Sequence, residues 1–145
     1  MVQDMTIPRL VLAFAAAASL AVPALASAST SNVTAVRAVA TRFVVDEYHG
    51  NAADACKLMT PRLQAAFVKI TVTAGAKGIT GCPKAFGLLL QSGGAQSMTL
   101  AQAEHALIAT PIQIHGTTAT MNSSKTTILV KVGTHWLFSK FGGVG

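Results

Sequence analysis

Acidic residues are scarce in this sequence. The chain has 145 residues, of which 5 are Asp or Glu and 11 are Lys or Arg, so its formal net charge is +6. Charged residues of both signs make up only 11% of the chain. Beyond residue 28 the acids are Asp46, Glu47, Asp54 and Glu104. So few carboxylates leave little material for general acid–base chemistry, which disfavours an enzyme.

Several chemical motifs are missing as well. The sequence has no G-x-S-x-G elbow, no phosphate-binding loop and no dinucleotide-binding glycine pattern. Its histidines lack an H-x-x-x-H spacing, so we expect surface positions and no metal site, although His115 and His135 could become neighbours across a sheet. The basic residues are scattered from Arg37 to Lys140, which argues against a nucleic-acid partner and leaves weak attraction to an anionic envelope. We expect no cofactor.

Apolar residues are concentrated at the N-terminus. They make up about 71% of residues 1–28 and about 46% of residues 29–145, and only the second share is typical of a globular chain. After the polar start Met1–Arg9, the apolar run Leu10–Val22 is shorter than the ~20 residues that span a bilayer. The small residues Ala26 and Ala28 suit a signal peptidase. The pattern predicts a signal peptide over 1–28 and one secreted or extracytoplasmic domain over 29–145.

Two other interpretations of this N-terminus stay open. The apolar run could be an internal helix of the domain, or an uncleaved membrane anchor. After cleavage we expect no stable membrane span. Asp4 is unusual in the start of a signal peptide, so either Met1 or Met5 could be the true initiator.

The chain has two cysteines, Cys56 and Cys82. An even number in an exported small domain favours a disulfide, which would stabilise the fold by roughly 3–4 kcal/mol at this separation. Two free buried thiols are the alternative. The pair lacks the C-x-x-C spacing of a redox site, and two cysteines alone cannot build a structural zinc site.

Helical patterns dominate the first half of the domain. Apolar residues recur at helical spacing over about 33–48, after a polar leader at 29–34, and Gly50 can end that helix. Asn51 is expected to cap a second helix that contains Cys56, and Thr60-Pro61 starts a third. A further helix is expected from Cys82 to about Leu90. Residues 98–106 are ambiguous between a short helix and irregular structure.

Strand patterns dominate the second half. Ile128, Val130 and Val132 share one face of the clearest strand, and Trp136 and Phe138 share one face of the next. Helices followed by antiparallel strands indicate an α+β domain. The expected strands are Leu107–Ala109, Ile112–Ile114, Thr117–Met121, Thr126–Val132 and His135–Phe141.

The order of these segments resembles a known superfamily. A first helix ending in Phe-Val-Val-Asp-Glu-Tyr-His-Gly-Asn precedes the short helix Ala-Ala-Asp-Ala-Cys-Lys-Leu-Met-Thr-Pro, and a second Cys opens the next helix. The last hairpin, Ile-Leu-Val-Lys-Val-Gly-Thr-His-Trp-Leu-Phe, carries a Trp just after its turn. This order is similar to the nuclear transport factor two-like superfamily in its exported, cystine-containing bacterial form, and to domains of the lumazine-binding type.

The resemblance covers about residues 33–141 and implies a cystatin-like α+β cone. In such a cone a curved, mostly antiparallel sheet wraps around a long first helix and leaves a pocket at the open end. It also implies that a Cys56–Cys82 bridge ties the second helix to the third. Large side chains that could line the pocket are Phe43, Tyr48, Phe67, Phe86, Met98, Met121 and Trp136. Tyr48 and Trp136 are favoured because each carries a polar group that needs a partner.

Solvated or capping roles are expected for the acids of the helical half. Asp46 and Glu47 should face water, and Asp54 should cap a helix. Glu104 and His105 could form an acid–base pair, but adjacent residues on a strand point to opposite faces. We therefore assign no catalytic residue.

Three functions remain after this reading. The first is a non-catalytic exported domain that binds a small apolar ligand or a protein partner in or on the cone. The second is an envelope assembly module that forms a homodimer, or pairs with an envelope protein, through the outer face of its sheet. The third is an isomerase, dehydratase or hydrolase that uses Tyr48 with a histidine or Glu104.

Overall fold

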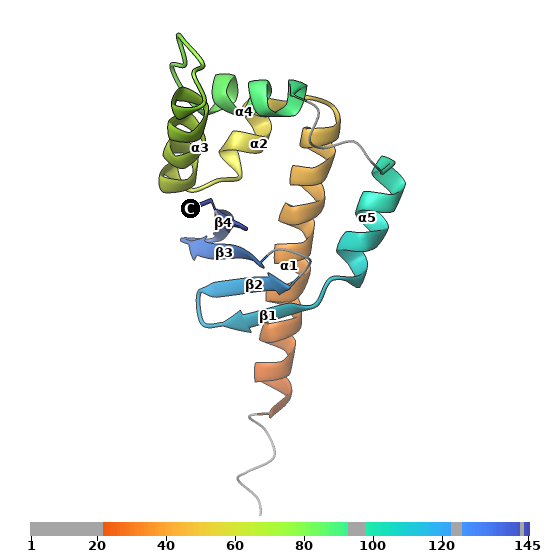
Figure 1. The fold of residues 1–145 in the computed structure, drawn as a ribbon. Coiled ribbons are helices and arrows are strands. Elements are labelled where there is room, and N and C mark those ends of the chain that lie inside the picture. The colour runs from red at the N-terminus through yellow and green to blue at the C-terminus, as the bar shows by residue number, and fades with distance from the viewer. Residues whose placement is uncertain (1–21, 93–97, 123–125, 143) are drawn as a thin grey trace, which may run out of the picture.

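The structure, a computed structural model, describes residues 22–92, 98–122, 126–142 and 144–145, and of residues 22–29 only the backbone. A long first helix crosses an antiparallel sheet, and shorter helices gather at one end of it (Figure 1). The described helices are α1 (Val22–Tyr48), α2 (Ala52–Lys57), α3 (Pro61–Thr73), α4 (Cys82–Gln91) and α5 (Leu100–Ala109). The strands are β1 (Ile112–His115), β2 (Thr118–Asn122), β3 (Thr126–Val132) and β4 (His135–Phe141).

The sheet is open and its strands follow one another in the order β1-β2-β3-β4, each antiparallel to its neighbour. This arrangement confirms the predicted α+β class. In Figure 1, α1 crosses the strands, α5 lies along α1, and α2, α3 and α4 gather beyond β4. The molecule therefore has a sheet half and a helical half, with α1 passing through both.

The first helix begins earlier than its apolar pattern predicted. We expected a start near residue 33 after a polar leader, but α1 begins at Val22. The alanines of this segment are strong helix formers. The hydroxyl of Thr34 donates to the carbonyl of Thr30 at 3.0 Å, so the polar residues also fit inside the helix.

The predicted signal peptide extends beyond the described chain. Its residues 1–21 lie outside the described residues, and α1 includes residues 22–28. Among the helices that the structure describes, none is both long enough and apolar enough to cross a membrane. Cleavage after Ala28 stays a prediction.

The third helix starts where Thr60-Pro61 predicted it. Thr60 is the N-cap residue and its hydroxyl accepts a hydrogen bond from the backbone N–H of Leu63 at 3.3 Å, with Pro61 in the first turn. The expected side-chain cap at Asn51 is wrong, since Asn51 precedes α2 without a capping side-chain bond. Gly50, which has φ +70°, ends α1 in the left-handed conformation that glycine adopts without strain.

The strand predicted at Leu107–Ala109 is wrong, because these residues form the last turn of α5. A capping box between Thr99 and Gln102 starts this helix. At its end, Arg37 Nη1 donates to the carbonyls of Leu107 and Ile108 at 2.7 and 2.6 Å. A cation from α1 thus satisfies the carbonyl end of α5, a tertiary contact that no local pattern reveals.

Two predicted strands match the structure at both ends, Thr126–Val132 and His135–Phe141. The core side of β3, however, carries Leu129, which is fully buried opposite Phe138. The apolar row of Ile128, Val130 and Val132 lies on the other side, where Val132 is 55% exposed. A register irregularity at Ile128/Leu129 accompanies this arrangement, and such a bulge shifts which residues face each other across the strands.

The core joins both halves of the molecule. Its sheet side includes Leu129, Trp136 and Phe138, and its helical side includes Val36 and Leu63. Cys56 and Cys82 are both buried and form the disulfide that connects α2 to α4. The predicted Cys56–Cys82 pairing is confirmed, but the bridge ties the second helix to the fourth and not to the third, because α3 lies between the two cysteines in the chain.

The disulfide should carry a large share of the stability of this small domain. Reduction is expected to lower the free energy of unfolding by roughly 3–4 kcal/mol, because the unfolded chain regains the entropy of a 26-residue loop. Urea denaturation with and without reductant measures this change.

The control for reduction is the double variant Cys56→Ala/Cys82→Ala, on which reductant should have no effect. Alkylation of the native chain without reductant should label neither cysteine. An unchanged unfolding midpoint on reduction, or labelling of both thiols without it, would contradict the bridge.

Candidate functional site

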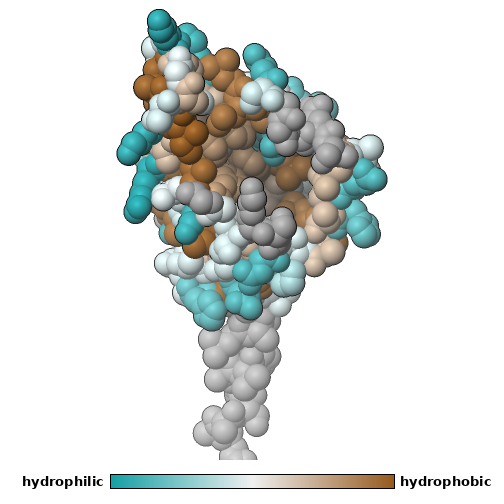
Figure 2. Space-filling model, in the orientation of Figure 1, coloured by the Kyte–Doolittle hydropathy of each residue, from teal (hydrophilic) through white to brown (hydrophobic). Residues whose placement is uncertain are grey.

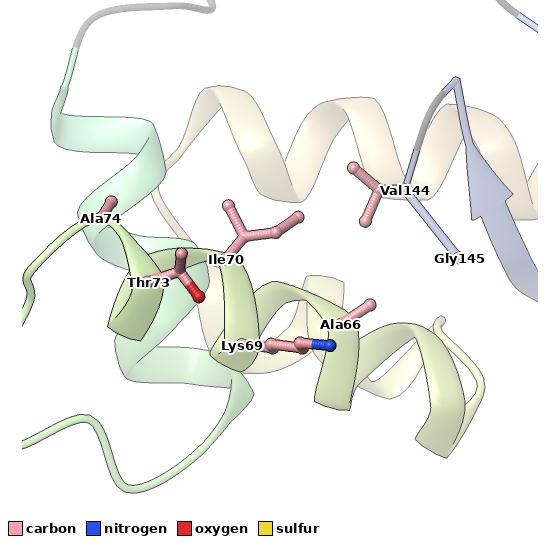
Figure 3. A pocket seen from close by; sticks show the side chains of 7 residues that line it. All are labelled: Ala66, Lys69, Ile70, Thr73, Ala74, Val144 and Gly145. Carbon is pink, nitrogen blue, oxygen red and sulfur yellow. The ribbon is translucent and has the colours of Figure 1, made fainter.

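An open groove of about 500 Å³ lies between α3 and the C-terminal residues of the chain. This volume is within the range of roughly 300–1,000 Å³ found for small-molecule sites. Figure 2 shows hydrophobic surface gathered over α3 beside a hollow in the same face of the molecule. The groove is lined by Ala66, Lys69, Ile70, Thr73, Ala74, Val144 and Gly145 (Figure 3).

One face of α3 supplies one wall of the groove. Its lining residues form two neighbouring rows, because Lys69 and Thr73 lie three and seven positions after Ala66, and Ile70 and Ala74 lie four and eight positions after it. The neighbouring row, with Leu63 and Phe67, is buried in the core. Ile70 remains 39% exposed although it follows the same apolar pattern as Phe67. The apolar surface of α3 is therefore wider than the core covers.

The C-terminal residues supply the opposite wall. After β4 the chain turns back, so that the backbones of Phe141 and Val144 exchange hydrogen bonds of 2.8 and 2.9 Å. Phe141 packs on Phe138 and Phe67, with ring centroids 4.6 and 6.3 Å apart. This packing places Val144 against α3 from the sheet side of the molecule.

Among the groove-lining residues Lys69 carries the formal charge and Thr73 a hydroxyl. In Figure 3 the Lys69 side chain extends along α3 toward Ala66, and the side chain of Ile70 points toward the space between α3 and Val144. The site thus offers an apolar floor with an ammonium group at its side. Such a lining can hold an apolar ligand and contact a polar head, and it contains no acid or histidine for proton transfer.

Most of the residues predicted to line a pocket lie in the core. Phe43, Phe67, Phe86, Met121 and Trp136 are all buried there, and Phe43 and Phe67 contact Phe86 at centroid distances of 5.7 and 5.3 Å. Tyr48 is half-buried at the end of α1, and Met98 is 44% exposed. None of these seven lines the groove at α3. Their role in a second cavity stays a prediction.

Trp136 has an indole N–H that finds no partner among the described residues. Its ring lies beneath Lys131, whose ammonium is 5.9 Å from the ring centroid and donates to Asn32 at 3.2 Å. The expectation of a polar partner for Trp136 is not met within the described chain.

The acids of α1 were expected to face water, and this is wrong for Asp46. Asp46 is only 8% exposed, and its Oδ2 lies 3.8 Å from Arg42 Nε, too far for a hydrogen bond. The chain folds back here, with the backbone N–H of Asn51 donating to the Asp46 carbonyl at 2.8 Å. This reversal of the chain covers the end of α1, where the spacing of apolar residues in the sequence predicted that Asp46 faces solvent.

The other two acids of the helical half also differ from their expected roles. Glu47 is half-buried, and burial raises the pKa of its carboxyl. Asp54 does not cap α2. It accepts a hydrogen bond of 2.7 Å from Lys57 one turn later, and this contact lowers the pKa of Asp54.

The four histidines are all exposed, as expected. His115 ends β1 and His135 begins β4, so they lie on opposite edge strands and are not neighbours. Within the described chain, no three His, Cys, Asp or Glu side chains gather where they could hold a metal ion. Glu104 and His105 lie on α5. We considered them as adjacent residues of a strand, whereas the structure places them in a helix.

Comparisons with known proteins found no match. No family model, no curated protein and no solved structure matches this chain. The function must therefore be inferred from the residues and geometry of the chain itself.

The buried carboxyl of Glu47 should make stability depend on pH. Its folded-state pKa is raised, so the neutral form favours folding in acid and this stabilisation is lost as the pH rises through the folded pKa. Glu47→Gln should therefore raise the melting temperature at about pH 7 and have a smaller effect near pH 4. Thermal unfolding followed by circular dichroism measures both.

Asp54→Asn should change the melting temperature at neutral pH in the opposite direction to Glu47→Gln. The contact with Lys57 lowers the pKa of Asp54, so the stabilisation from the Asp54 carboxylate is present at neutral pH and disappears as the pH falls through the folded pKa.

The prediction for Glu47 has its own contradicting outcome. A Glu47→Gln variant that is less stable than the parent at neutral pH would show that the Glu47 carboxylate is favourably paired there.

Proposed function

We propose that this protein is a non-catalytic, extracytoplasmic domain that binds a small apolar ligand in the groove between α3 and the C-terminal residues. The observation that carries the proposal is the groove lining, which is mainly apolar and includes the exposed side chain of Ile70. A contiguous exposed apolar surface in a hollow is a typical feature of a ligand site.

The energetics of the groove favour a small apolar ligand. Each methylene group that a ligand buries contributes at most about 0.8 kcal/mol, so several are needed for micromolar affinity. A groove of about 500 Å³ has room for such a chain. The lining lacks acid–base groups, and Tyr48, Glu104 and the histidines lie outside it, so this groove gives no support to the alternative of catalysis.

The proposed location outside the cytoplasm is supported by the disulfide. A buried Cys56–Cys82 bridge in a small domain is typical of an oxidising compartment. The apolar N-terminal run of the sequence agrees with export. Both observations favour a secreted or cell-envelope protein.

We also propose a nuclear transport factor two-like cone as the finer description of the fold. The long α1 packed against an antiparallel sheet, followed by short helices joined by a disulfide, supports it. The groove lies on the outer side of this arrangement, between α3 and the chain end, and not between α1 and the sheet. A ligand site there would differ from the open-end pocket that the resemblance implies.

Binding of straight-chain alcohols tests the groove directly. Isothermal titration with octanol, nonanol and decanol should show affinity rising by up to about fourfold for each added methylene group. Ile70→Asn should weaken decanol binding roughly five- to tenfold, since it removes the largest apolar contact of the α3 wall.

The matched control is Val132→Asn, which changes another exposed apolar residue, on β3 and outside the groove lining. It should leave decanol affinity unchanged. Circular dichroism confirms that both variants fold. Absence of alcohol binding, or an Ile70→Asn variant that binds as the parent does, would refute the groove as the ligand site.

A second candidate function is assembly through the outer face of the sheet. Ile128, Val130 and Leu137 are half-buried there and Val132 is 55% exposed, while the opposite face packs on the core. An uncovered apolar row of this kind favours pairing with a second copy. Sedimentation equilibrium over a concentration series should then show a dimer that Val132→Asp dissociates, and a monomer at every concentration would exclude it.

A further inference from the structure

Basic residues outnumber acidic ones in the segment of the chain that contains α3. The segment Asn51–Ser92 contains five basic residues and the single acid Asp54, which is bound to Lys57 at 2.7 Å. Within the described chain, no acidic side chain forms an ion pair with the remaining four, Arg62, Lys69, Lys77 and Lys84. The segment from α2 to α4 therefore carries more basic than acidic side chains, and Lys69 is one of the basic side chains without an ion pair to a described acidic side chain.

Lys69 is the member of this set that lines the groove. It lies on the same row of α3 as Ala66 and Thr73, one position before Ile70. Figure 3 shows its ammonium group beside Ala66, next to the apolar floor formed with Val144. The groove thus combines an apolar channel with a free cation along one wall.

These two properties select a ligand with two parts. A purely apolar molecule would leave the ammonium group without an anion, and a small inorganic anion would leave the apolar floor exposed to water. A molecule with an apolar chain and one anionic end satisfies both.

We propose that the ligand is a single-chain amphiphile with an anionic head group, such as a medium-chain carboxylate. Its head group contacts Lys69 Nζ, and its chain lies against Ile70, Ala74 and Val144. This inference rests on the apolar groove proposed above and adds the chemical class of the ligand.

The expected contribution of the head group is modest and measurable. An ion pair at a solvent-accessible site changes binding by about 1.5- to 5-fold, and salt weakens it. The apolar chain therefore supplies most of the affinity, and the charge decides between ligands with the same chain.

Isothermal titration with decanoate and decanol, both below the concentrations at which they aggregate, separates the two contributions. The parent chain should bind both, with decanoate affinity falling as salt is added and decanol affinity unchanged. Lys69→Gln should weaken decanoate about 1.5- to 5-fold and leave decanol unchanged.

Lys84→Gln is the matched control, since it removes one equally exposed and unpaired positive charge. Lys84 lies on α4 with its ammonium beside Gly78 in the loop after α3, outside the groove lining. It should have a smaller effect on decanoate than Lys69→Gln. If both variants weakened decanoate binding equally, the proposed contact with Lys69 would be overturned, because the positive charges would then act on the ligand only at a distance.

The remaining outcomes distinguish this inference from the proposed function. Binding of decanol with no Lys69-dependent preference for decanoate would overturn the anionic head group and leave the apolar groove standing. Binding of neither compound would refute the groove itself. Binding to anionic phospholipid vesicles without binding of monomeric decanoate would overturn the single amphiphile as the ligand and indicate a membrane surface.

Discussion

The contact on which the rest of the structure depends is the docking of Phe138 between the sheet and the helical half. Its backbone N–H donates to the Leu58 carbonyl, and its carbonyl accepts from the Thr60 N–H, both at 2.8 Å. Its ring lies 4.9 Å from that of Phe43 on α1 and stacks on Phe141. One residue of β4 thus joins the sheet, the first helix and the linker that starts α3.

The groove is a consequence of this docking. Phe138 positions Phe141, and the backbone of Phe141 holds Val144 against α3. On the other wall, Phe67 anchors α3 to the same aromatic cluster, which turns Ile70 outward into the groove. The disulfide adds a second constraint, because it ties α2 to the α4 helix that packs on α3. A rigid core therefore holds an apolar surface that the fold leaves uncovered.

Local signals in the sequence predicted the elements that depend on local physics. Pro61 has the fixed φ that suits a first helical turn, and the strands at 126–132 and 135–141 are rich in β-branched and aromatic residues on either side of a Gly-containing turn. An even number of cysteines, in a chain with an apolar N-terminal run, predicted the Cys56–Cys82 bridge. The errors arose where tertiary contacts decide. Arg37 satisfies the end of α5, the reversal at Asn51 accompanies the burial of Asp46, and β3 packs on the core through Leu129 and not through Ile128, Val130 and Val132.

The groove itself could be recognised only in part. The sequence shows Leu63, Phe67 and Ile70 at helical spacing. It does not show that the core covers Leu63 and Phe67 and leaves Ile70 exposed. The most direct test is therefore an amide NMR titration of the protein with decanoate. The account predicts chemical-shift changes concentrated at Ala66, Lys69, Ile70 and Val144. Changes centred instead on Tyr48 and Met98, or on the outer face of β3, would contradict it.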